Sequence, residues 1–265
     1  MLKVNAISKT FNPGTVNEKK ALSALSLHLE AGDFVTVIGS NGAGKSTLLN
    51  AVAGVFYVDE GRIVLGGRDI TFLPEHRRSQ GIGRLFQDPL KGTAPNMTIE
   101  ENLALAYLRS AKGNPFSRIS QKDKALFRER LALLGMGLED RMSQPVGLLS
   151  GGQRQALTLL MATLVPPQLL LLDEHTAALD PATADKVLEL TRQVVAREKI
   201  TCLMVTHNMH QALTLGNRTL MMADGRIVLD VSGDERAAMT VEDLLRKFRE
   251  GTGRELDNDR MLLSD

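Results

Sequence analysis

The chain of 265 residues contains few of the residue types that stabilise secreted or membrane proteins. Its only cysteine is Cys202, so no disulfide bond can form within the chain, and this fits a reducing compartment. It has no tryptophan, and aromatic residues make up 4% of the sequence, so we expect an aliphatic core. The formal net charge is +1, which provides no basic field for binding nucleic acid.

Long hydrophobic runs are also missing from the sequence. A membrane-spanning helix needs about 20 predominantly apolar residues, and the longest apolar stretches here are interrupted, for example by Pro166-Pro167 and by Asp173. The N-terminus does not have the pattern of a signal peptide. We therefore expect a protein that does not cross a membrane by itself and acts at one only through other chains.

A glycine-rich segment is the strongest feature that is present. Residues 39–47 fit the phosphate-loop pattern G-x-x-x-x-G-K-[ST], which a chain of this length matches by chance about once in a hundred sequences. Residues 33–38 predict a strand before the loop, and residues 48–53 predict a helix after it. The predicted nucleotide-binding residues are Gly39, Ser40, Asn41, Gly42, Ala43, Gly44, Lys45, Ser46 and Thr47.

The chemistry of such a loop follows from its backbone and from two side chains. The glycines let several backbone N–H groups point at phosphate oxygens, and the positive end of the following helix adds to that field. Lys45 would reach the β- and γ-phosphates, and the Ser46 hydroxyl would ligate Mg²⁺. The sequence therefore predicts binding of a nucleoside triphosphate with Mg²⁺.

A second glycine-rich turn makes the prediction more specific. It is followed by an apolar segment, 156–165, with helical spacing, so it predicts another helix N-terminus that can hold an anion. The chain thus has two phosphate-binding turns but one lysine-bearing loop, which favours a head-to-tail pair of chains. The residues of this signature turn are Leu149, Ser150, Gly151, Gly152 and Gln153. Together with the phosphate loop they resemble the ATP-binding subunits of ABC transporters, over nearly the whole chain.

The resemblance implies roles for an acidic pair and a histidine. Apolar residues 169–172 predict a buried parallel strand that ends in Asp173 and Glu174, where open α/β sheets bind ligands. By resemblance, Asp173 holds the Mg²⁺ shell and Glu174 polarises the attacking water. His207, which follows another buried strand, is similar to the family's histidine that contacts the γ-phosphate and orients that water.

Two further residues acquire roles from the resemblance alone. Gln87 is similar to the glutamine that senses Mg²⁺ and the attacking water and links to the helical subdomain. Phe11 occupies the place of the aromatic residue that stacks on adenine. In the family, a groove near this glutamine passes motion to the membrane subunits, and we expect segment 88–102 to form it.

The predicted fold class is α/β, with a P-loop NTPase (RecA-like) core, an antiparallel β subdomain and an inserted α-helical subdomain. We expect one ABC ATPase domain over 1–265. Within it, 1–87 and 161–231 form the nucleotide-binding core, 88–160 the helical subdomain with the signature turn, and 232–265 a short tail. Gly66-Gly67 and Asp224-Gly225 predict hairpins.

Local signals also place several helices. Thr98 with Glu101 predicts a capped helix start, and Asp180-Pro181 predicts a helix that runs to about Glu198. Spacing in 122–134 and 240–249 indicates two more helices, and residues 255–260 form a polar stretch for which we expect disorder.

The resemblance implies ATP-driven transport with several partners. These are a second ATPase subunit (the same chain or a close paralogue), membrane-spanning permease subunits and an extracytoplasmic solute-binding protein, with this chain at the cytoplasmic face of the membrane. Segments 148–156, 174–181 and 206–209 most resemble those of bacterial importers of branched-chain or aromatic amino acids. His175 after the catalytic acid, where Pro is usual, and Ala177, where Ser or Thr is usual, resemble a subgroup of these importers tied to tryptophan- or tyrosine-type uptake.

Two other classes stay open on the sequence. One is an ABC ATPase without membrane subunits, of the cluster-assembly type. The other is a phosphate-loop kinase acting on a small molecule, which ranks last because it leaves the signature turn without a role.

Overall fold

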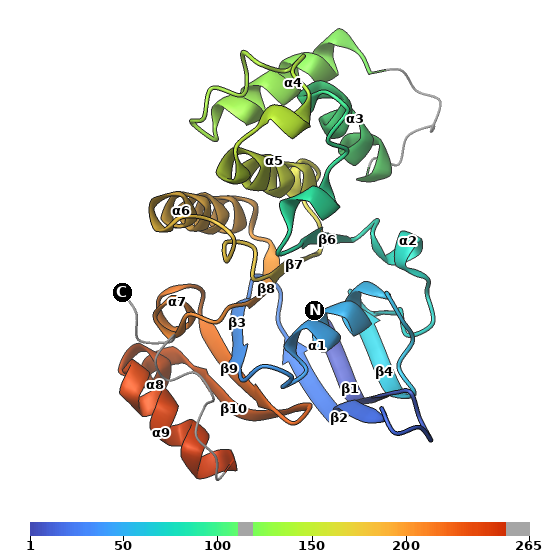
Figure 1. Ribbon diagram of the computed structural model, residues 1–265, viewed down its shortest axis with the longest axis vertical. Helices are drawn as coiled ribbons and strands as arrows, with labels where there is room; N and C mark the ends of the chain where they lie inside the picture. The colour runs from blue at the N-terminus through green and yellow to red at the C-terminus, as the bar shows by residue number, and fades with distance from the viewer. Residues whose placement is uncertain (111–118, 253–265) are drawn as a thin grey trace. The chain divides into compact units, whose positions relative to one another are not determined.

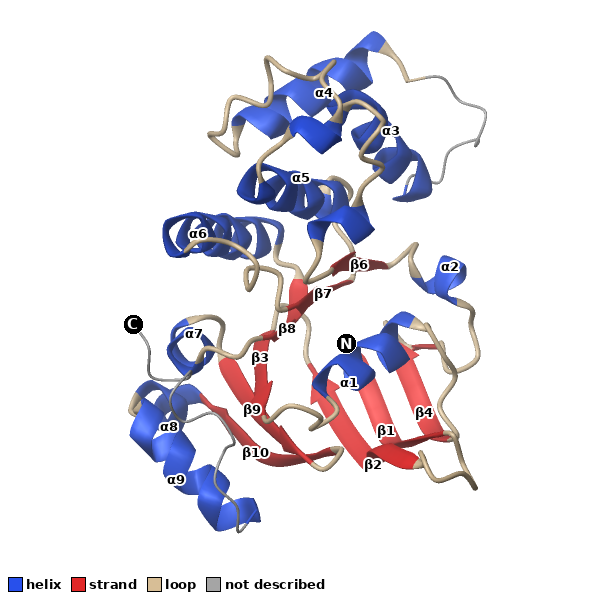
Figure 2. Cartoon of the chain, in the orientation of Figure 1, coloured by secondary structure: helices blue, strands red, loops and turns tan. Residues whose placement is uncertain are grey.

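The computed structural model describes residues 1–110 and 119–252, which form two compact units (Figures 1 and 2). The first unit comprises Met1–Arg78 and Lys199–Asp265, and the second comprises Ser79–Glu198. We describe each unit by itself. The first carries most of the strands, and the second carries most of the long helices (Figure 2).

An antiparallel sheet lies in the first unit. Its order is β2-β1-β4-β5, and its strands are β1 (Leu2–Phe11), β2 (Lys19–Leu29), β4 (Glu60–Leu65) and β5 (Arg68–Asp69). Leu2 pairs with Leu29 on one side and with Leu65 on the other, and all three side chains are buried. The tight pairing of β4 with β5 confirms the hairpin predicted at Gly66-Gly67.

A second group of strands in the first unit carries the phosphate loop. These strands are β3 (Phe34–Gly39), β8 (Thr201–Val205), β9 (Arg218–Ala223) and β10 (Arg226–Ser232). β3 pairs in parallel with β8 and with β9, and β10 pairs antiparallel to β9 through the predicted hairpin. Every residue of β8, including Cys202, is buried, as expected for a parallel strand covered on both faces.

The first unit also contains α-helices. They are α1 (Lys45–Ala53), α2 (Glu75–Arg78), α7 (Met209–Thr214), α8 (Gly233–Ala237) and α9 (Val241–Thr252). The helix predicted after the phosphate loop is therefore confirmed. The helix predicted at 240–249 is confirmed as α9, whereas 255–260 lies outside the described residues.

The second unit combines a parallel pair of strands with the helical insert. The strands are β6 (Ile82–Leu85) and β7 (Leu169–Asp173). The α-helices are α3 (Ile99–Ser110), α4 (Gln121–Ala132), α5 (Gly151–Thr163) and α6 (Pro181–Glu198), and short 3₁₀ turns cover η1 (Pro89–Gly92) and η2 (Val146–Leu148). Among residues 1–110 and 119–252, no helix is both long and apolar enough to span a membrane.

Helix starts in the second unit agree with the local signals of the sequence. The Thr98 hydroxyl accepts from the Glu101 N–H, and the Glu101 carboxylate accepts from the Thr98 N–H, so the predicted capping pair is confirmed. The Asp180 carboxylate accepts from the Thr183 N–H at 3.1 Å, so α6 begins at Pro181 as predicted.

Candidate nucleotide-binding site

The phosphate loop connects β3 to α1 and is packed tightly against its neighbours. Gly39 and Gly44 have φ angles of +146° and +100°, which side chains other than glycine rarely adopt. A Cβ atom on Gly39 would lie 2.2 Å from the carbonyl oxygen of Met222, and one on Gly44 would lie 2.6 Å from that of Ala21. Only glycine fits at these two positions.

Lys45 supplies a positive charge inside this loop. Its side chain is 5% exposed, and its Nζ donates to the carbonyl oxygens of Gly39 at 2.7 Å and Ser40 at 3.0 Å. A buried ammonium group needs such acceptors, because leaving it unpaired costs several kcal/mol. Phosphate oxygens are stronger acceptors for the same group. Ser46, at the start of the same helix, is exposed and presents a hydroxyl.

Phe11 lies at the end of β1 and forms one edge of an aromatic cluster. Its ring meets that of Phe56 edge-on, with centroids 5.2 Å apart and an interplanar angle of 84°. Lys9 lies 5.8 Å from the Phe11 ring centroid and donates to the carboxylate of Asp59 at 2.6 Å. The Lys9 hydrogen bond lowers the pKa of Asp59 below its usual value. The cluster fixes the Phe11 ring, and its contact with adenine stays a prediction.

The structure adds Lys19, which the sequence analysis does not single out. Lys19 begins β2 and pairs with Phe11 across the sheet. Its Nζ lies 3.3 Å from the position that a Cβ atom on Gly42 would take, so an exposed cation stands at the phosphate loop. Lys19 reaches the phosphate loop only because β1 pairs with β2, and no local sequence pattern predicts that pairing.

The acidic pair sits at the end of β7. Asp173 is the last residue of the strand, and Glu174 has a φ angle of +47°, a left-handed conformation that is uncommon outside glycine. The Ala177 N–H donates to the Glu174 carbonyl at 3.0 Å, which begins a tight turn. Both acids are half-buried, whereas Ala177 and Ala178 are exposed. The turn thus presents the acids at the strand end where a ligand site is expected.

His175 is buried beside the acidic pair and packs against α6. Its side chain is 1% exposed, and its Nε2 lies 3.2 Å from the hydroxyl of Thr191. That hydroxyl donates its proton to the Val187 carbonyl at 2.8 Å, so Nε2 must be the protonated nitrogen that donates to Thr191. Nδ1 has no hydrogen-bond partner among the described residues. Burial lowers the pKa of His175 from 6.5 to about 4, so the ring is neutral at physiological pH.

This burial makes stability depend on pH. In the unfolded chain His175 takes up a proton near pH 6.5, and in the folded chain only near pH 4. Stability is therefore full above pH 6.5 and falls as the pH is lowered toward 4, by up to roughly 3 kcal/mol. His175→Gln cannot take up this proton, so we expect a flatter pH dependence of its free energy of unfolding. Denaturant unfolding followed by circular dichroism between pH 4.5 and 7.5 measures this, and equal slopes for both proteins would contradict it.

The signature turn forms the N-terminus of α5. Ser150 is the N-cap: its hydroxyl accepts from the Gln153 N–H at 3.3 Å, and the Gln153 side chain accepts from the Ser150 N–H at 3.2 Å. A Cβ atom on Gly152 would lie 2.0 Å from the Thr183 methyl carbon, so the first turn of α5 packs closely against α6. Ser150 and Gly151 are exposed. An anion could therefore approach this end of the helix from solvent.

The predicted coupling segment, 88–102, is tied to the signature turn. Asn102 is buried, and its side chain accepts from the Ala94 N–H at 2.8 Å and donates to the carbonyls of Ala94 and Thr98. The Gly147 N–H, three residues before Ser150, donates to the Pro95 carbonyl at 2.8 Å. A displacement of this segment would therefore reach the signature turn through a few hydrogen bonds.

His207 and Gln87 each follow a buried strand. His207 lies between β8 and α7, and its neighbours fix its backbone. The Thr206 hydroxyl donates to the Gln211 side chain at 2.9 Å, and the Asn208 side chain accepts from the Gln211 N–H at 2.9 Å. Gln87 follows β6 and is exposed.

The predicted site residues fall into two groups. The first unit contains Phe11, the phosphate loop and His207, and the second contains Gln87, the signature turn, Asp173 and Glu174. Among the described residues, no three His, Cys, Asp or Glu side chains form a metal-binding group. Each unit offers a hard oxygen donor of the kind that Mg²⁺ prefers, the Ser46 hydroxyl in the first and the Asp173 carboxylate in the second.

Known proteins resemble this chain over most of its length. The family model described as ABC transporter matches residues 22–177. The tyrosine transport ATP-binding protein of Clostridioides difficile (strain R20291) is 44% identical, over 94% of this chain and 98% of that protein. The thiamine import ATP-binding protein of Salmonella paratyphi A is 34% identical, over 79% of this chain and 84% of that protein.

Solved structures agree with the sequence comparisons. A dimeric ATP-binding cassette in a post-hydrolysis state, bound to ADP and phosphate, superposes with a TM-score of 0.76 at 26% identity, over 88% of this chain and 98% of that one. A nucleotide-free cassette from an ABC transporter gives a TM-score of 0.72 at 27% identity, over 89% and 92% of the two chains. The phosphate loop, the signature turn and these likenesses place the chain in the ABC transporter family, as an ATP-binding subunit that hydrolyses ATP.

Proposed function

We propose that this ATPase works as one half of a dimer and drives the uptake of an amino acid through separate membrane subunits. The observation that carries the solute class is the likeness to the tyrosine transport protein, which extends over nearly the full length of both chains. Aromatic amino acids of the tyrosine type are the solutes we propose. In this proposal the membrane subunits contact the solute and the ATPase does not, so the likeness of the whole chain supports the solute class and no single residue does.

The proposed dimer follows from how the two phosphate-binding turns are built. Ser150 and Gly151 are exposed at the start of α5, as are Ala177 and Ala178 after the acidic pair. Head-to-tail pairing would give each signature turn the nucleotide held by the partner's phosphate loop. The likeness to a dimeric cassette bound to ADP and phosphate supports this arrangement.

In the proposed mechanism different residues bind the nucleotide, hold Mg²⁺ and activate the attacking water. Lys45 and the loop N–H groups bind and neutralise the phosphates, and Phe11 packs on the base. Ser46, Asp173 and Gln87 would hold Mg²⁺, which supplies positive charge at the transferred phosphate when bound. Glu174 would accept a proton from the attacking water, and His207 would orient that water. Hydrolysis stays slow until the partner's signature turn adds its donors.

Coupling to the membrane subunits is assigned to segment 88–102, within a helical subdomain over 88–160. Leu90 in this segment is 47% exposed, which suits contact with a permease helix. The hydrogen bonds from Asn102 and Gly147 would pass a displacement of the segment to the signature turn. In this proposal the chain works at the cytoplasmic face of the membrane, and the system would include an extracytoplasmic solute-binding protein.

Affinity purification from native membranes tests this proposal. The tagged chain, solubilised in detergent and analysed by mass spectrometry, should retain a polytopic membrane protein at near-stoichiometric yield. Leu90→Glu should lose that protein, because a charge would be buried in the docking surface. Leu133→Glu is the matched control, because Leu133 is 51% exposed but lies outside segment 88–102, and it should retain the protein. Recovery of soluble partners alone would favour a cluster-assembly ATPase instead.

A further inference from the structure

The C-terminal helices α8 and α9 contact α7, the helix that begins directly after the proposed catalytic residue His207. α7 begins at Met209, two residues after His207. Thr206 and Asn208, on either side of His207, bond to Gln211 in the first turns of that helix. The position of α7 therefore fixes the backbone from which the His207 side chain extends.

Arg236 of α8 holds the other end of α7. Its side chain is nearly buried, and its guanidinium donates to the carbonyls of Ala212, Leu215 and Gly216, the first and third of these at 3.0 Å. Its Nε donates to the Thr219 hydroxyl at 2.8 Å, which in turn donates to the Ala212 carbonyl. These carbonyls are at the C-terminal end of α7, where a positive charge is favourable. Arg236 thus occupies acceptors that the helix itself leaves unsatisfied.

α9 covers the apolar face of α7. Leu244 and Phe248 of α9 are buried in one cluster with Met209 and Ala212 of α7. The same cluster includes Ile38, the residue before Gly39 of the phosphate loop. Because a close-packed core transmits displacements, a shift of α9 would also displace α7 and the end of β3 that leads to the phosphate loop.

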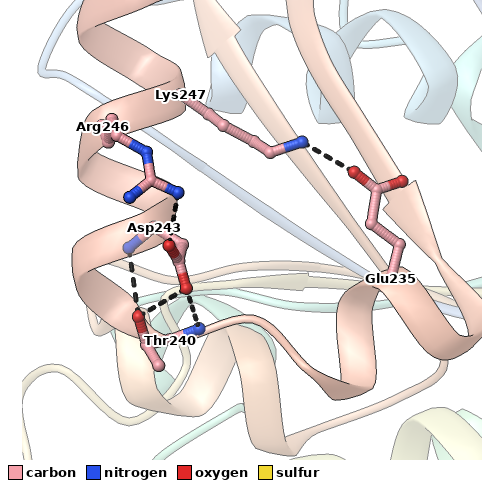
Figure 3. Close-up of polar contacts among 5 residues, drawn as sticks. All are labelled: Glu235, Thr240, Asp243, Arg246 and Lys247. Atoms are coloured by element: carbon pink, nitrogen blue, oxygen red, sulfur yellow. Dashed lines mark hydrogen bonds and ion pairs between the residues drawn. The ribbon is translucent and has the colours of Figure 1, made fainter.

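Polar contacts cap α9, and one exposed ion pair links it to α8 (Figure 3). Thr240 caps α9: its hydroxyl accepts from the Asp243 N–H at 3.2 Å, and the Asp243 carboxylate accepts from the Thr240 N–H at 3.0 Å. Lys247 of α9 forms an ion pair with Glu235 of α8 at 2.7 Å. Both side chains of this pair reach solvent, so the pair adds little stability compared with the buried contacts of Arg236 and Phe248.

We propose that α8 and α9 position His207 for hydrolysis, with Arg236 as the positioning residue that acts through α7. This inference rests on the proposed role of His207 at the attacking water. It assigns the C-terminal segment a role in the rate of the chemical step. It assigns Arg236 itself no role in binding ATP, because its hydrogen-bond partners among the described residues include no residue of the phosphate loop.

A double-mutant cycle tests the inference. Arg236→Lys keeps the charge but cannot satisfy four acceptors, so we expect kcat to fall about tenfold with the KM for ATP within about twofold of wild type. In a His207→Ala background the same substitution should cause no further loss, because the group that it positions is gone. Single-turnover hydrolysis with excess enzyme and labelled ATP measures all four proteins, including the slowest.

Controls separate positioning from a loss of folding. Lys247→Gln breaks only the exposed ion pair and should leave kcat unchanged. If Arg236→Lys folds poorly, as judged by its thermal midpoint, Phe248→Leu replaces it as the variant that loosens α9. The ring signals of His207 in NMR spectra should move in Arg236→Lys and stay in place in Lys247→Gln.

The outcomes are distinguishable. An equal loss from Arg236→Lys with and without His207 would overturn the inference, because Arg236 would then act on the fold as a whole. If Arg236→Lys keeps the wild-type kcat while His207→Ala hydrolyses ATP more slowly, the inference is wrong but the proposed role of His207 stands. Wild-type hydrolysis by His207→Ala would remove both the inference and the proposed role of His207.

Discussion

Glu174→Gln should bind ATP as the wild type does and hydrolyse it about 10²–10⁴-fold more slowly. Gln keeps the size and the hydrogen-bonding oxygen of the side chain but cannot take a proton from water. The backbone at this position is left-handed, with φ at +47°, and Gln bears the same strain as Glu, so the turn should persist. Because closure would still be driven by ATP, the variant should accumulate as a closed dimer. Phosphate release and size-exclusion chromatography with ATP and Mg²⁺ measure the two effects.

The matched control is Glu189→Gln, the same chemical change in the same unit. Glu189 lies on α6, is exposed, and forms its hydrogen bonds with Arg192 and Gln193. An exposed pair of this kind contributes little to stability, so turnover and dimerisation should match the wild type. If Glu174→Gln hydrolyses ATP within twofold of the wild-type rate, Glu174 is not the catalytic base.

Elements fixed by a few neighbouring residues could be predicted from the sequence. The start of α6 needs only Asp180, Pro181 and the Thr183 N–H, and the structure begins the helix where these residues predict. The β4–β5 turn needs two glycines in sequence. The phosphate loop is of the same kind, since its pattern and its flanking strand and helix lie within about twenty residues.

Contacts between distant parts of the chain could not be predicted in this way. Arg236 lies in a polar segment of the sequence, where an exposed side chain would be expected. It is buried because it donates to backbone carbonyls at the end of α7, which lie 20 and 24 residues earlier in the chain. Arg78 is similar: it is buried against the carbonyls of Ala51 and Val52 at the end of α1. In both cases the acceptors are backbone groups, which the sequence does not distinguish. Burial of His175 likewise depends on Thr191 of α6.

Lys45→Ala should weaken ATP binding by about 10- to 100-fold, since a hydrogen bond to a charged group contributes roughly 1.5–3 kcal/mol. The Lys45 side chain is nearly buried in the loop. Removing it also leaves the carbonyls of Gly39 and Ser40 without this donor. Isothermal titration calorimetry with ATP and Mg²⁺ measures the affinity. The thermal midpoint without nucleotide separately measures the cost to the fold.

Lys3→Ala is the control for this substitution. Lys3 is an exposed lysine on β1, far in sequence from the loop, and its loss changes the net charge by the same amount. A ligand that binds only the folded state raises stability by RT ln(1 + [L]/Kd), so ATP should raise the thermal midpoint of Lys3→Ala as much as that of the wild type. The same ATP concentration should raise the midpoint of Lys45→Ala much less. An equal rise in both variants would mean that Lys45 does not bind phosphate, whatever the change in the midpoint without nucleotide.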